Sequence, residues 1–82
     1  MSDKIPETVT AQIGRNILLR RTSMKMLQGE LAQKTGLSQA HLSNIEQGKR
    51  NLTVEVLAVI ANALSCEMAD LLPAPPSRKQ AA

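Results

Sequence analysis

The sequence contains no phenylalanine, tyrosine or tryptophan among its 82 residues. Modules that bind single strands or splayed RNA loops usually stack bases on aromatic rings, so this absence argues against that class of binding. Duplex DNA is read through groove edges and phosphates and needs no aromatic platform. If the partner is a nucleic acid, the composition therefore favours a double-stranded one.

Cysteine and histidine are almost absent, with Cys66 and His41 as the only examples. This pair cannot supply an internal disulfide or a zinc site built from the usual ligands. The sequence also lacks a Ser/His/acid arrangement, a glycine-rich phosphate loop and a carboxylate cluster. We therefore expect a protein that is not an enzyme and has no metal or cofactor.

Long hydrophobic runs are missing as well. The longest extends from Val56 to Ala61, whereas a membrane span needs about 18 apolar residues. The first four residues do not open like a signal peptide. These features predict a soluble cytoplasmic protein that does not use a membrane.

Basic residues are concentrated in the first two thirds of the chain. Residues 1–53 hold eight lysines and arginines against four acidic residues, whereas residues 54–82 hold two against three. An anionic partner would meet the first part. The alternative is a solvated surface with unevenly distributed charge.

Capping residues and apolar spacing predict five short helices, at about residues 12–24, 28–35, 39–47, 54–64 and 67–72. Thr8 or Thr10 can cap the first helix, and Ser38 can cap the third. Gly36 and Gly48 suit the left-handed positions that end the second and third. We predict a compact all-α domain over residues 9–72, an N-terminal arm over 1–8 and a disordered, proline-rich basic tail over 73–82.

The third predicted helix turns small and amide-bearing side chains away from the core. At about 100° per residue, Leu42 and Ile45 form its inward face. The outward residues are Ala40, Ser43, Asn44 and Gln47. An Asn or Gln amide can bond bidentately to adenine, and alanine can pack on a thymine methyl. This face suits a helix in the major groove; the alternative is an ordinary amphipathic surface helix.

The fourth predicted helix has two apolar stripes. The core stripe is Val54, Leu57, Ile60, Ala61 and Leu64, and Met24, Met26 and Met68 are expected to fill gaps in or near the core. The second stripe is Val56, Val59 and Ala63. Because a monomer does not need both stripes, the second predicts a homodimer interface.

At this point the chain resembles the lambda-repressor-like, or Xre/Cro, family of helix-turn-helix regulators, over about Thr10 to Leu72. The matching residues are Ile13-Gly14, Arg21, Gln28 with Glu30-Leu31-Ala32, Gly36-Leu37-Ser38, Leu42 to Gly48, Arg50-Asn51 and Ala63-Leu64. The stretch Arg50 to Thr53 also looks like the restriction-modification controller branch.

The resemblance implies a five-helix domain with the helix-turn-helix in helices two and three. It implies base reading by Ser38, Gln39, Ala40, Ser43 and Asn44 in a recognition helix over about Ser38–Gln47. Phosphate contacts are expected from Gln28, Gln47, Lys49, Arg50 and Asn51. His41 lies beside this surface, where it either contacts a phosphate or is a solvated side chain. Arg21 and Glu46 are implied to form a structural ion pair.

Five residues depart from the family pattern. Leu27 stands where a capping Ser or Thr is frequent, and Arg20 where an apolar residue is common. Lys25 and Ser65 replace common glycines, and Leu52 replaces a frequent proline. We expect a weaker start of the second helix and a backbone that tolerates Leu52 and Ser65. Cys66 falls at an apolar position of the family, which implies a buried packing role rather than a redox sensor.

These features together predict a sequence-specific transcriptional regulator, a repressor or autoregulator, that binds a near-palindromic operator as a homodimer. The alternative is an antitoxin or adaptor that acts through an unknown protein partner on helices four and five.

Overall fold

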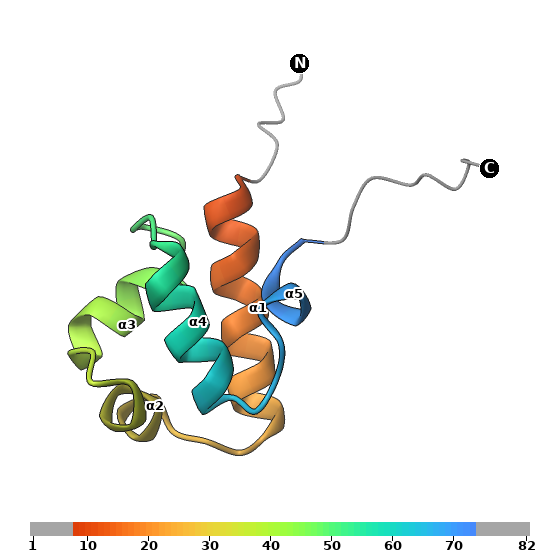
Figure 1. Cartoon of the computed structure of the whole chain (residues 1–82). Coiled ribbons are helices and arrows are strands. Elements are labelled where there is room, and N and C mark those ends of the chain that lie inside the picture. Colours follow the sequence, from red (N-terminus) through yellow and green to blue (C-terminus); the bar gives the residue numbers. More distant parts are fainter. Residues whose placement is uncertain (1–7, 74–82) are drawn as a thin grey trace.

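Five α-helices follow one another in the computed structural model, which describes residues 8–73 (Figure 1). They are α1 (Val9–Ser23), α2 (Gln28–Thr35), α3 (Gln39–Glu46), α4 (Val54–Ala63) and α5 (Met68–Leu71). The described part of the chain contains no strand. Except for Thr8 and Pro73, the predicted arm and tail lie outside the described residues.

Three of the helices begin at a hydroxyl-bearing residue. The Thr8 hydroxyl accepts a hydrogen bond from the backbone N–H of Ala11 at 3.0 Å, so Thr8 rather than Thr10 caps α1. Ser38 caps α3 in the same way, and Thr53 caps α4. Each cap satisfies a backbone donor that the first helical turn leaves without a partner.

The second helix begins differently. The side chain of Leu27 cannot accept a hydrogen bond, but the Glu30 carboxylate accepts one from the Leu27 backbone N–H at 2.8 Å. Only one half of a capping box is therefore present. The turn before α2 passes through Lys25 at a φ of 58°, and the turn after α4 passes through Ser65 at 56°. Both positions are left-handed, the conformation for which glycine is favoured.

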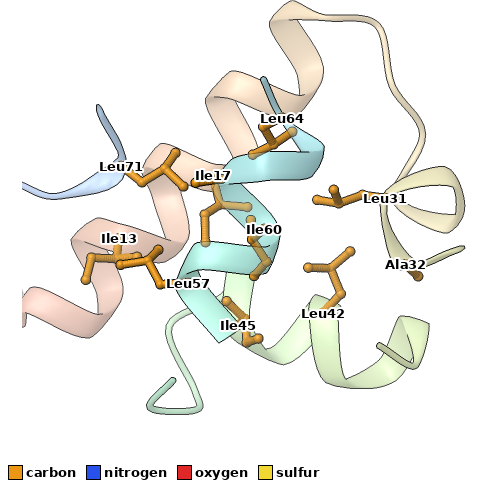
Figure 2. Close-up of a cluster of buried hydrophobic side chains, with 11 residues drawn as sticks. Ile13, Ile17, Leu31, Ala32, Leu42, Ile45, Leu57, Ile60, Leu64 and Leu71 are labelled. Carbon is orange, nitrogen blue, oxygen red and sulfur yellow. The ribbon is translucent and has the colours of Figure 1, made fainter. Parts of the chain in front are cut away.

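The core is formed by apolar side chains from all five helices (Figure 2). Ile17, Leu31, Leu42, Ile45, Ile60 and Leu64 are fully buried. Leu71 brings α5 against α1, where the Asn16 side chain donates to the carbonyl oxygen of Leu71. Cys66, Met26 and Met68 pack partly buried around this cluster.

Two predicted core residues are on the surface. Val54 is 67% exposed and is the first residue of α4. Met24 is 38% exposed because it follows the last residue of α1, where the chain turns away. Helical spacing had assigned Val54 to the core face, and Met24 had been expected to fill a gap in or near the core.

The first and third helices approach each other closely. A Cβ atom on Gly14 would overlap the carbonyl oxygen of Ile45 and would lie 3.0 Å from that of Glu46. Glycine therefore allows the α1 backbone to touch the end of α3. This contact fixes α3 on the bundle.

Candidate nucleic-acid interface

One side of α3 is covered by the core and the other faces outward. Figure 1 shows α3 at one edge of the bundle and α5 beyond α4 and α1 on the other side. Leu42 and Ile45 are fully buried. The five predicted base-reading residues are all accessible. Ser38, Gln39 and Ala40 are exposed, and Ser43 and Asn44 are half-buried.

A side-chain hydrogen bond joins the starts of α2 and α3. The Gln39 amide nitrogen Nε2 lies 3.3 Å from Gln28 Oε1 and donates to it. Gln28 in turn donates through Nε2 to Glu46 Oε1 at 3.0 Å. An amide NH2 has two N–H groups, so each glutamine retains one donor that neither bond uses. The orientation of both side chains is thereby restricted.

Arg21 and Glu46 form a buried bidentate ion pair. Arg21 Nε lies 2.7 Å from Glu46 Oε2, and Nη2 lies 3.0 Å from Oε1. The third guanidinium nitrogen donates to the backbone carbonyl of Met26 at 2.8 Å. The pair therefore ties the end of α1 to the last residue of α3 and to the chain that leads into α2. Parallel hydrogen bonds of this kind are strong and geometrically specific.

Three outward residues of α3 differ in the hydrogen bonds they already make. The Ser38 hydroxyl accepts from the His41 backbone N–H, and the Ser43 hydroxyl accepts from Gln47 Nε2 at 2.9 Å. Both hydroxyl hydrogens are left to donate. The Asn44 side chain makes no hydrogen bond to any residue in 8–73, so its donors and acceptor are all available.

The loop after α3 carries exposed cations. Lys49, Arg50 and Asn51 are exposed, and neither cation forms an ion pair within the described range. His41, which lies within α3, is half-buried. The Asn51 carbonyl oxygen Oδ1 accepts a hydrogen bond from the Thr10 hydroxyl at 2.8 Å. Sequence reasoning considered Thr10 only as a cap and missed this contact.

The second apolar stripe of α4 is narrower than expected. Val59 is 44% exposed, but Val56 and Ala63 are half-buried and pack against the core of their own chain. Val59 and Ala63 line a shallow groove between α2 and α4, together with Lys34, Ala58, Asn62 and Ser65. Of the three residues of the predicted stripe, only Val59 is therefore well exposed, and it lies in this groove.

Arg20 makes contacts that the sequence did not predict. Its Nε donates to the carbonyl oxygen of Leu64 at 3.1 Å, and Nη2 donates to that of Ser65 at 3.0 Å. These carbonyls follow the last turn of α4 and have no helical partner. The presence of arginine where the family commonly has an apolar residue was the available signal for these contacts.

Burial raises the pKa of the Cys66 thiol, which fits a packed side chain.

Within residues 8–73, no three histidine, cysteine or acidic side chains gather in a way that could hold a metal ion. Among the helices of the same range, none is both long and apolar enough to cross a bilayer.

The chain is similar to known helix-turn-helix proteins. Residues 17–71 match the helix-turn-helix family HTH_3. Over 60 residues the chain is 35% identical to the uncharacterised HTH-type transcriptional regulator y4dJ of Sinorhizobium fredii, which covers 73% of this chain and 78% of that protein.

Two solved structures have the same arrangement of helices. The restriction-modification controller protein C.AhdI from Aeromonas hydrophila superimposes with a TM-score of 0.74 at 27% identity, covering 76% of this chain and 94% of that one. The clp gene regulator ClgR from Corynebacterium glutamicum superimposes with a TM-score of 0.78 at 26% identity, covering 80% and 86%.

Proposed function

The chain belongs to the helix-turn-helix family HTH_3, and from this membership we propose that it represses transcription by binding a near-palindromic operator as a homodimer. Membership confirms the predicted all-α fold with a helix-turn-helix in α2 and α3, and the resemblance to lambda-repressor-like regulators. The family and the relatives are transcriptional regulators rather than enzymes, as the sequence predicted.

The observation that carries the proposal is the outer face of α3. Small or amide-bearing side chains cover it, and they leave the helix slender enough to enter the major groove. The Asn44 amide has its oxygen and both N–H groups available, and Ala40 is exposed near the start of the helix. We assign base reading to Ser38, Gln39, Ala40, Ser43 and Asn44.

The contact between Gln28 and Gln39 supports this assignment. Because Gln39 donates only one N–H to Gln28, its second N–H and its Oε1 remain available for a base. The remaining N–H of Gln28 is suited to a phosphate oxygen at the start of α2. A base contact and a phosphate contact would then be made by two side chains that hold each other in place.

Affinity is proposed to come mainly from the loop after α3. Lys49 and Arg50 are exposed cations without protein partners in the described range, so they can neutralise phosphates and release counterions. His41, Gln47 and Asn51 are proposed to add hydrogen bonds to the backbone. Such contacts fix the position of the protein on the duplex but do not specify the sequence.

The homodimer is proposed to form through α4 and α5. Val59 in the α2–α4 groove is the most exposed residue of the predicted stripe, and Val56 and Ala63 are half-buried. Two-fold pairing would set two copies of α3 about 34 Å apart, one turn of B-DNA. A dimer on an operator that overlaps a promoter would compete with polymerase.

Binding selection from random duplex DNA at near-physiological salt tests this function. We expect enrichment of a two-fold symmetric motif. Failure to enrich any sequence would contradict sequence-specific regulation and would favour the second candidate, an antitoxin or adaptor that uses the α2–α4 groove for a protein partner. That candidate has the exposed Val59 groove in its favour.

A further inference from the structure

The first turn of α1 contacts the loop after α3 at two points. The Thr10 hydroxyl donates to Asn51 Oδ1 at 2.8 Å, across 41 residues of sequence. Gly48 lies so close to α1 that a Cβ atom there would be 2.8 Å from the Ala11 Cα. The loop is therefore held against α1 at both ends, and Lys49 and Arg50 lie between the two contacts.

Thr10 is free to make this contact because it does not cap its helix. The Thr8 hydroxyl performs that role by accepting from the Ala11 backbone N–H. The Thr10 side chain is half-buried and directed at the loop, whereas Asn51 is exposed. One threonine thus begins the helix, and the other is available to the loop.

The direction of the hydrogen bond determines what Asn51 presents to solvent. An amide has a carbonyl oxygen that accepts and an NH2 group that donates. Because the Thr10 hydroxyl occupies the oxygen, the NH2 group of Asn51 is directed away from Thr10. A phosphate oxygen accepts a hydrogen bond from NH2 but is repelled by a carbonyl oxygen.

We infer that Thr10 is a positioning residue for DNA binding, which orients the Asn51 amide so that its NH2 group meets a phosphate. This inference rests on the proposed function, because it needs a duplex bound by the loop. Thr10 itself does not contact DNA in this arrangement. Without its hydroxyl, the Asn51 amide can rotate and present either end to the phosphate.

Single methylphosphonate substitutions along the selected duplex test the inference, because each removes the charge and one acceptor oxygen of one phosphate. For the wild-type protein we expect one substitution per half-site to weaken binding by roughly two- to tenfold through Asn51. Asn51→Ala should lose sensitivity at that phosphate alone. Thr10→Val, which keeps the shape but removes the hydroxyl, should lose it as well.

Two control variants separate positioning from general damage. Thr10→Ser retains the hydroxyl and should keep the wild-type sensitivity. Thr22→Val removes an exposed α1 hydroxyl that bonds only within its helix, to the carbonyl oxygens of Leu18 and Leu19, and should also keep it. If Thr10→Val failed to fold, it would bind the unmodified duplex and every methylphosphonate duplex more weakly, and the loss would not be confined to one phosphate.

The outcomes distinguish the two levels of the proposal. If Asn51→Ala loses the phosphate-specific sensitivity and Thr10→Val retains it, the role of Thr10 is wrong while the proposed function stands. If Asn51→Ala behaves like the wild type, Asn51 makes no phosphate contact and the inference fails. A selection that enriches no duplex overturns the proposed function and this inference with it.

Discussion

Glu46 is the residue on which the polar contacts behind the proposed interface converge. Its carboxylate accepts two hydrogen bonds from Arg21 and one from Gln28, and the residue is only 8% exposed. Through Gln28 and Gln39, these contacts extend from the buried ion pair to the start of α3. A buried charge of this kind is stable only while its partners are present.

Removing one partner of the ion pair should therefore be costly. For Arg21→Met we expect a loss of about 3–5 kcal/mol in the free energy of unfolding, because Glu46 is left buried without a counter-charge. Urea denaturation measures the loss. The double variant Arg21→Met with Glu46→Leu should recover most of it. A single variant as stable as the wild type would show that the pair has no structural role.

At the scale of elements, the close crossing of α1 and α3 depends on the missing side chain of Gly14. Gly14→Ala should lower stability by about 1–3 kcal/mol, because the new methyl group must displace the backbone of Ile45. Gly29→Ala in α2 is the matched control, because its Cβ would lie 3.5 Å from the nearest atom, the side-chain oxygen Oε1 of Gln39. That variant should be neutral or gain up to about 0.5 kcal/mol through helix propensity. Thermal melts of the two variants measure these changes in stability. An equal loss of stability in both variants would contradict the proposed crowding at Gly14.

At the start of α2, which lacks a side-chain cap, we expect a substitution to increase stability. Leu27→Ser should stabilise the protein by about 0.5–1 kcal/mol, because the hydroxyl would complete the capping box that Glu30 half supplies. Ser38→Ala removes an existing cap from α3 and should cost a similar amount. The same melts measure both changes. No gain from Leu27→Ser beside a clear loss from Ser38→Ala would mean that Glu30 alone suffices.

The order of the helices and most of their bounds were predictable because they depend on neighbouring residues, but α1 begins at Val9 and not near residue 12. Ser38 and Gly36 mark the ends of α3 and α2 through caps and a left-handed turn, and both were read directly from the sequence. The exposure of Val54 was not predictable, because periodicity does not say where the covering helices end. Contacts such as Arg20 with Leu64 were not predictable either, because they depend on which carbonyls the finished fold places opposite α1.

Some features of the site were likewise predictable from the sequence and others were not. The sequence placed Asn44 and Ser43 on the outer face of α3, and both are accessible there. It did not reveal that Gln28 bonds to Glu46 and Gln39 at once, since three residues from two helices must first be folded together. It also overestimated the free apolar surface of α4, because Val56 and Ala63 cover part of their own core.

On the scale of the whole molecule, the proposed dimer depends on Val59. Val59→Lys should raise the dimer dissociation constant at least about tenfold, because a charge replaces an apolar side chain buried between copies. Light scattering at micromolar concentration measures this change. Leu19→Lys replaces an exposed apolar residue on α1 and should leave the dimer intact. A wild-type protein that is monomeric both free and on the selected duplex would rule out the dimer.

The charge distribution of the whole molecule supports the same orientation. The exposed cations Lys49 and Arg50 follow α3, whereas from Val54 to Pro73 the described chain carries acidic residues and no basic ones. The exposed cations of this loop therefore attract an approaching duplex to the α3 side. The proposed dimer surface is left free on a DNA-bound protein.

The central claim is that the outer face of α3 reads bases, and the affinity of Asn44→Ala for every single-base variant of the selected duplex tests it most directly. We predict that this variant loses about 1–3 kcal/mol of discrimination at one base pair per half-site and keeps the rest of the profile. Arg50→Ala, the comparison, should weaken all duplexes alike and lower the salt slope by about one. An equal loss for Asn44→Ala on every duplex would contradict base reading by α3.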